Sequence, residues 1–245
     1  MKKAQTELAT GDTELGNKVW YLRQNRLFEA ASDQAVFSYE HLFRVALFPK
    51  RSMVFDHGDP TRTVYLIKRG KIRISRLTAD GKEVTVALLA AGDLFGEESL
   101  FASAPRTTVA TCIEETLLCV AKADDMLALL SQDSSLALNV AKVLSNRLTD
   151  ASAAMEDLAY ARVSDRIMHL LVRLANEHGT RREDGILLDV RLTHSDIASL
   201  VGSTRETVSL ELSNLVRAGR ICGDARSIVV PFCEFAHETG ANARC

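Results

Sequence analysis

The 245-residue sequence has no run of about 18 consecutive apolar residues, which a membrane-spanning helix needs. Residues 1–16 are largely polar and lack the apolar core of a secretory signal peptide. Its cysteines are few, five in number, and no His/Cys cluster has the spacing of a metal site. We therefore expect a cytoplasmic protein with reduced thiols, no membrane partner and no bound metal.

Neither sign of charge is in large excess, since 30 Lys and Arg face 32 Asp and Glu and the formal net charge is −2. No global basic field indicates a nucleic-acid partner, so any such contact must rest on local charge. Hydrophobic residues make up 47% of the chain, which excludes a disordered or collagen-like protein. The sequence also lacks a nucleophile–base pair and a phosphate loop, so we predict no catalytic residue and no enzyme.

The patterning divides the chain into four parts. Residues 1–18 are predicted to be a disordered tail. Residues 19–123 contain short strand-like segments with turn signals about every ten residues, which is typical of an antiparallel barrel or sandwich. Residues 124–162 are predicted to form a helix pair, and residues 163–245 a second small domain.

A long helix is predicted from Ser134 to Arg162, because no glycine or proline occurs between Asp124 and His178. Its apolar residues repeat with alternating spacings of four and three, which is the pattern of a coiled-coil seam. The residues that we assign to this seam are Leu144, Leu148, Ala151, Met155 and Leu158. The seam predicts a parallel homodimer, since two-fold dimers are the commonest assemblies. The alternative is a helix that packs on its own barrel.

Two predicted capping boxes, Thr193–Asp196 and Ser203–Glu206, lie ten residues apart with Val201-Gly202 between them. This spacing predicts two short helices joined by a tight turn. A predicted hairpin follows between Arg220 and Val230. Helix, turn, helix and hairpin together predict a winged helix-turn-helix.

The second helix of such a motif places its N-terminal residues at base edges in the major groove. Arg205 can bond guanine through two hydrogen bonds, and Glu206 can accept from cytosine. Ser203, Thr204 and Thr207 carry short hydroxyls suited to phosphate. The alternative for Arg205 and Glu206 is a solvated helix start.

The domain after Arg162 contains ten Arg and no Lys against eleven acidic residues. A DNA-binding face must therefore be built locally, and the candidates are helix N-termini together with Arg205, Arg217, Arg220 and Arg226.

A second constellation combines Gly96 and Glu97 with Arg106 and Thr107 inside the strand-rich domain. A glycine turn exposes backbone N–H groups, Glu can bond a ribose hydroxyl, and Arg and Thr can hold a phosphate. The alternative is a hairpin with a surface Arg and Glu.

With these features, residues 19–235 resemble the cyclic-AMP receptor protein and fumarate–nitrate regulator superfamily. The segment from Leu192 to Val208 also resembles the cyanobacterial global nitrogen regulators. The resemblance implies an α+β protein with an N-terminal antiparallel β-roll like that of cyclic-nucleotide-binding domains, a long dimerisation helix and a C-terminal winged helix-turn-helix. It implies a homodimeric transcription regulator that binds an inverted repeat in double-stranded DNA and contacts RNA polymerase. Cyclic AMP or another small anion is the implied effector.

The resemblance also implies roles for single residues of the effector site. Gly96 and Glu97 match the pair that the cyclic-nucleotide branch uses for the ribose, and Arg106 and Thr107 match its cyclic-phosphate pair. The adenine-binding Thr-Ser of the long helix reads Ala151-Ser152 here, so only Ser152 carries over. Glu98 stands where the family usually has an apolar residue.

In the DNA-binding half, Arg205 and Glu206 match the base readers of the family, while His194 and Ser195 match its phosphate contacts. The further Arg of the family, one turn later, is Leu210 here. Two alternatives stay open: a regulator of this family that needs no effector or responds to redox through Cys112 and Cys119, and a cyclic-nucleotide-binding module without DNA binding.

Overall fold

The computed structural model describes residues 22, 25–28, 37, 39–102, 104–188, 192–224 and 227–236. The predicted disordered tail, residues 1–18, lies outside this range. The chain forms two compact units, Met1–Arg147 and Leu148–Cys245. The boundary between the units falls inside the long helix, whereas the sequence pattern treats residues 124–162 as a separate part. The four-part division stays a prediction.

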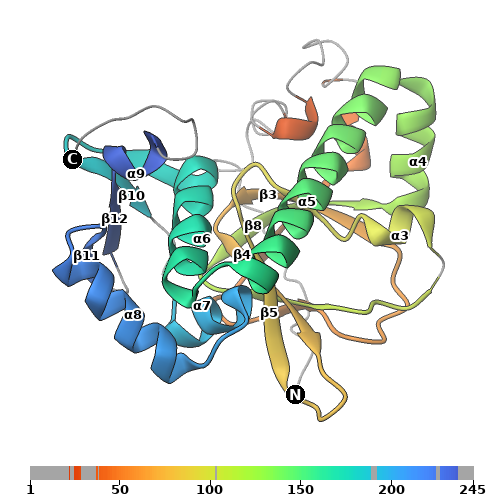
Figure 1. Cartoon of the computed structure of the whole chain (residues 1–245). Helices are drawn as coiled ribbons and strands as arrows, with labels where there is room; N and C mark the ends of the chain where they lie inside the picture. The colour runs from red at the N-terminus through yellow and green to blue at the C-terminus, as the bar shows by residue number, and fades with distance from the viewer. Residues whose placement is uncertain are drawn as a thin grey trace. The chain divides into compact units, whose positions relative to one another are not determined.

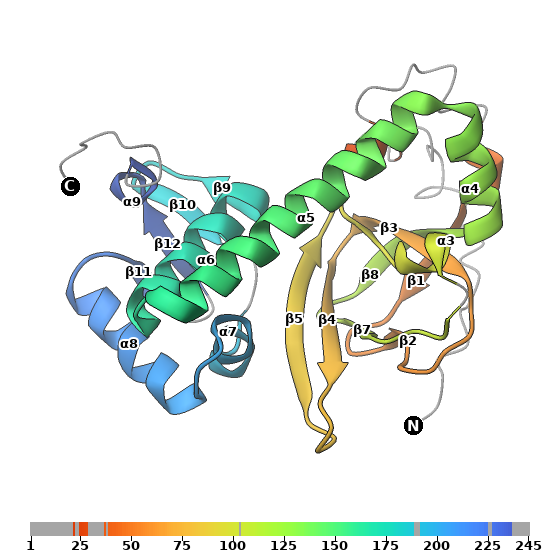
Figure 2. The ribbon, with the colours of Figure 1, turned by 45° about the vertical axis from the view of Figure 1, so that its right-hand side comes forward.

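Two four-stranded antiparallel sheets form the centre of the first unit (Figure 2). The first sheet has the order β1 (Arg44–Phe48), β8 (Thr116–Lys122), β3 (Thr63–Arg69) and β6 (Leu94–Phe95). The second has the order β2 (Met53–Phe55), β7 (Val109–Cys112), β4 (Lys71–Leu77) and β5 (Glu83–Ala90). The predicted antiparallel β-roll is confirmed.

The first sheet is buried on both faces. One face contributes Tyr65 and Leu118 to a core that it shares with Ile72 and Ala110 of the second sheet. The other face packs against η1 (Arg26–Phe28), α3 (Glu98–Phe101), α4 (Ala123–Gln132) and the start of α5 (Ser134–Tyr160). The 3-10 turn η2 (Glu40–Leu42) precedes β1. Burial on both faces explains why β8 reads as a continuous apolar run.

Helix α5 begins at Ser134, as the sequence predicts, and ends at Tyr160 instead of the predicted Arg162. Its cap is Asp133. The Asp133 carboxylate accepts hydrogen bonds from the backbone N–H groups of Ser135 (3.0 Å) and Leu136 (3.3 Å). The bond from the Ser135 hydroxyl (2.6 Å) is the main cause that lowers the pKa of Asp133. The first turns bury Leu136 and Val140 in the core of their own unit, so the alternative of packing on the barrel holds for this part of the helix.

The second unit is a winged helix-turn-helix, as predicted (Figure 1). Its helices are α6 (Val163–His178), α7 (His194–Val201), α8 (Arg205–Arg217) and α9 (Phe232–Ala236). Its sheet has the order β11 (Cys222–Asp224), β12 (Ser227–Pro231), β10 (Gly185–Leu188) and β9 (Gly179–Arg181). Ile197, Val208 and Leu215 are among the buried side chains of its helices.

One of the two predicted capping boxes is confirmed, and at the other site a single cap replaces the box one residue later. Thr193 and Asp196 form a complete box at the start of α7. At α8 the cap is Thr204, whose side chain accepts from the Thr207 N–H at 3.2 Å, so the predicted Ser203 cap is wrong. The shift arises because Gly202, with φ at +61°, ends α7 and Ser203 completes the turn.

We expect Thr193→Ala to destabilise the second unit by about 1 kcal/mol, because the Asp196 N–H at the start of α7 loses its acceptor. Thr193→Ser is the matched control, since it keeps the hydroxyl. Chemical denaturation monitored by circular dichroism checks both variants. Equal stability of the two variants would contradict the capping role.

The cysteines do not support a redox pair within the first unit. Cys112 and Cys119 belong to different core clusters. Burial raises the pKa of the Cys112 thiol, which disfavours the reactive thiolate. No helix among the described residues is long and apolar enough to cross a membrane, and those residues contain no group of three potential metal ligands.

Candidate effector cassette and nucleic-acid interface

Gly96, Glu97, Arg106 and Thr107, which we call the cassette, lie between β6 and β7 of the first unit. Gly96 has a φ of +77°, and a Cβ atom there would lie 2.9 Å from the Thr63 carbonyl oxygen and 3.1 Å from Arg106 Nη1. Only glycine fits these two constraints together. The glycine therefore lets the arginine side chain pass close to the backbone.

Arg106 is buried, with its side chain only 1% exposed. Its Nη1 donates to the Gly96 carbonyl oxygen and to Glu98 Oε1, both at 2.9 Å, and its Nη2 donates to the Thr63 carbonyl oxygen. The guanidinium carbon lies 4.4 Å from the centre of the Phe55 ring. Nε is buried and has no hydrogen-bond partner among the described residues. Arg106 thus makes its strong contacts within the chain.

Glu97 is also paired within the chain, with a residue that the sequence analysis missed. Arg147 of α5 donates to Glu97 Oε1 and to the Leu94 carbonyl oxygen. No local pattern in the sequence links Arg147 to Glu97, because the two residues lie 50 positions apart. Thr107 is exposed. The structure thus brings Gly96, Glu97 and Arg106 together.

Ser152 belongs to the second unit, where its hydroxyl donates to the Leu148 carbonyl oxygen at 2.9 Å. Its predicted role in effector binding stays a prediction.

The start of α8 presents the predicted base readers to solvent. Arg205 and Glu206 are both exposed in the first turn of the helix. The hydroxyls of Thr204 and Thr207 lie 2.9 Å apart and contribute to the cap. Leu210, one turn later, is 59% exposed. This end of α8 therefore offers one cation, one anion and one apolar group.

The two candidate phosphate-binding arginines differ in their surroundings. Arg217 is exposed and donates to Asn214 Oδ1 at 2.6 Å and to the Ser213 carbonyl oxygen at 3.4 Å. Arg220 donates through Nε and Nη2 to the two oxygens of Glu234, at 3.0 and 2.7 Å. The hydrogen bond to Glu234 raises the pKa of Arg220 further. Arg220 therefore holds α9 to the domain, whereas Arg217 is bound only to its own helix; a phosphate contact by either residue stays a prediction. Arg226 lies outside the described residues.

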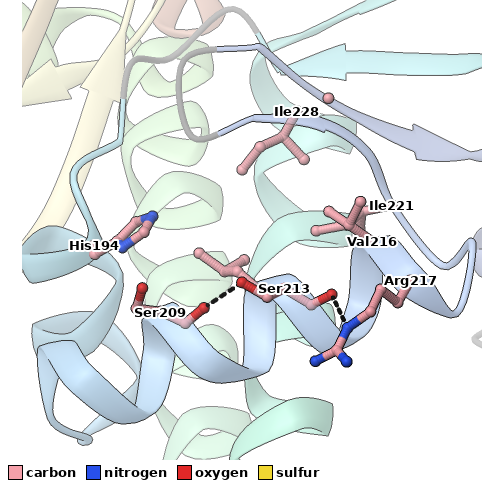
Figure 3. Close-up of a pocket in the computed structure, with 9 residues that line it drawn as sticks. His194, Ser209, Ser213, Val216, Arg217, Ile221 and Ile228 are labelled. Carbon is pink, nitrogen blue, oxygen red and sulfur yellow. Dashed lines mark hydrogen bonds between the residues drawn. The ribbon is translucent and has the colours of Figure 1, made fainter.

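A cavity of about 390 Å³ lies between α8 and the wing (Figure 3). Its polar lining comes from His194, Ser209, Ser213 and Arg217, and its apolar lining from Leu212, Val216, Ile221 and Ile228. The sequence analysis predicted phosphate contacts at His194 and Arg217, and the structure places both at this one hollow. Ser195, the neighbour of His194, is exposed in the first turn of α7.

Comparison with known proteins assigns both units. Residues 46–133 match the cyclic nucleotide-binding domain, and residues 165–232 match the Crp-like helix-turn-helix domain. The cyclic AMP receptor protein of Thermus thermophilus is 32% identical over 198 residues, which cover 81% of this chain and 88% of that protein. The chain belongs to the Crp/Fnr family of transcription regulators.

Two further relatives show how varied this family is. The global nitrogen regulator of Synechocystis is 31% identical over 188 residues, covering 76% of this chain and 84% of that protein. The c-di-GMP-responsive regulator CLP of Xanthomonas campestris superposes with a TM-score of 0.67 at 25% identity, covering 82% of this chain and 99% of that one. The predicted Crp/Fnr membership and fold are confirmed.

Proposed function

We propose that this Crp/Fnr protein is a homodimeric transcription regulator that binds an inverted repeat in double-stranded DNA. The observation that carries the proposal is the exposed start of α8, which presents Arg205 and Glu206 to solvent. Further along the same helix, Ser213 and Arg217 line a hollow together with His194. Side chains at the start of such a helix reach base edges in the major groove. The groups at the hollow suit phosphate, and RNA polymerase is the further partner that a transcription regulator needs.

The proposed dimer rests on the middle and end of α5. Leu148, Met155 and Leu158 are 69%, 70% and 53% exposed in the single chain. Together with Ala151 they form a continuous apolar stripe at heptad spacing, while Leu144 packs partly against the core of its own unit. A stripe of this kind is stable in water when a second copy covers it. A DNA-binding regulator also suits the predicted cytoplasmic location.

The barrel is the proposed sensing domain, with the cassette as its effector site. In the cyclic-nucleotide branch the residues at these positions bind a ribose hydroxyl and a phosphate, and the pairing of Arg106 with Glu98 decides whether this chain does the same. The second candidate is a regulator that needs no effector. It is favoured by one specific observation: both charged residues of the cassette already have partners within the chain, Glu97 with Arg147 and Arg106 with Glu98.

Selection of fragments of the source genome by the purified full chain tests the proposed function. We expect a small set of enriched fragments that share an inverted repeat, and stronger binding to these than to random duplexes in a competition assay. Equal binding to all fragments, or no binding to any fragment, would overturn the proposal.

A further inference from the structure

Arg106 carries a positive charge into the interior of the first unit. Two of its hydrogen-bond acceptors, the carbonyl oxygens of Thr63 and Gly96, bring no full charge. A buried cation is costly unless an anion pairs with it. The group that supplies this anion therefore decides what else can bind the guanidinium.

Glu98 supplies the anion. Its Oε1 lies 2.9 Å from Arg106 Nη1, and its side chain is 42% exposed while that of the arginine is 1% exposed. The carboxylate thus reaches both the guanidinium and the solvent. An effector phosphate approaching Arg106 from solvent meets a carboxylate that already holds the same donor.

The energetics of this pair oppose an anionic ligand in two ways. A phosphate must break the charge-assisted bond between Glu98 and Arg106 before it can accept from Nη1. It must then share the site with a second negative charge, and salt screens partly buried charges less than exposed ones. An apolar residue at position 98 would impose neither cost.

The formal charges of the cassette are balanced without a ligand, although Arg106 Nε has no hydrogen-bond partner among the described residues. The Glu97 carboxylate pairs with Arg147, so each charge of the cassette has an opposite charge supplied by the chain. Binding of a phosphate ester at Arg106 would leave Glu98 without its cation.

We infer that Glu98 determines effector specificity: its carboxylate takes the place of an effector phosphate on Arg106, so that the cassette excludes cyclic nucleotides and related phosphate esters. The inference rests on the proposed function only in treating the barrel as the sensing domain. It names Glu98 as the residue responsible and the phosphate ester as the excluded class.

Calorimetry on the full chain tests this, with cyclic AMP as the anionic probe and adenosine as the neutral one. Glu98→Gln keeps the size and an acceptor oxygen but removes the charge, and Glu98→Leu removes both. We expect both variants to bind cyclic AMP at least about tenfold more tightly than wild type, with adenosine binding unchanged. Glu115→Gln is the matched control, because it removes a charge that pairs with Arg69 instead, and it should behave as wild type.

Two results would overturn the inference: no gain in cyclic AMP affinity over wild type in either Glu98 variant, or an equal gain in Glu115→Gln. A gain for adenosine equal to that for cyclic AMP would also overturn it, since the effect would then not concern the phosphate. The assay contains no DNA, so its failure is distinct from a failure of the proposed DNA-binding function.

Discussion

Replacing Leu148 with Glu should convert the proposed dimer into a monomer and abolish tight DNA binding. Leu148 is 69% exposed in the single chain, so the substitution leaves the monomer's core intact. In a two-fold seam it places two like charges in a desolvated interface, a change that we expect to cost about 3–5 kcal/mol. Sedimentation velocity and fluorescence anisotropy with labelled duplex measure the two effects.

The matched control is Leu138→Glu, on the same helix but outside the proposed seam. Leu138 is 64% exposed, so the two substitutions change charge and exposed apolar area alike. A Leu148→Glu variant that stays dimeric, or a Leu138→Glu variant that dissociates equally, would refute the seam assignment.

Replacing Arg205 with Ala should relax base preference at one position of each half-site. Its guanidinium is exposed at the start of α8, where a bidentate contact with guanine contributes about 1–3 kcal/mol of discrimination. Anisotropy titrations on duplexes that differ at single positions measure this loss.

We also expect one poorly specified base pair, because Leu210 offers no hydrogen bond where the family has an arginine.

Arg217→Ala is the informative comparison, because Arg217 lines the hollow beside the wing. As a phosphate contact it should weaken binding to all sequences together and reduce the salt slope by about one. If Arg205→Ala instead weakens all sequences equally, its role in base readout is wrong.

The helical half of the molecule could be predicted well from the sequence because its determinants are local. The cap at Asp133, the absence of glycine and proline after it, and the Thr193 box fix helix starts through neighbours within three residues. The second cap was misplaced by one residue because Ser203 and Thr204 are both good capping residues, and the tertiary position of the turn selects Thr204.

The barrel was harder to predict, since its contacts link distant residues. β1 is hard to recognise in the sequence because its burial does not alternate, and the two-residue β6 is too short to show a period. In β4, strict alternation predicts that Ser75 and Ile72 lie on opposite faces of the sheet. A bulge between Ile74 and Ser75 breaks this alternation, and both Ile72 and Ser75 are buried.

The ion pairs of the cassette were hard to predict for the same reason. Gly96, Glu97 and Arg106 could be selected by their types and spacing, and Glu98 was noticeable as a charge in an apolar position. That Glu98 holds Arg106 depends on the short helix α3, and that Arg147 holds Glu97 depends on contact across 50 residues. Neither ion pair produces a periodic pattern in the sequence from which it could be inferred.

The central claim is that two copies of the chain read DNA through α8. Its most direct test is selection from fully randomised duplexes by wild-type protein and by Arg205→Ala. We predict an inverted repeat with half-sites about 34 Å apart, one turn of the double helix, and loss of preference at one symmetric position in the variant. A motif without two-fold symmetry, or the same motif for both proteins, would contradict the account.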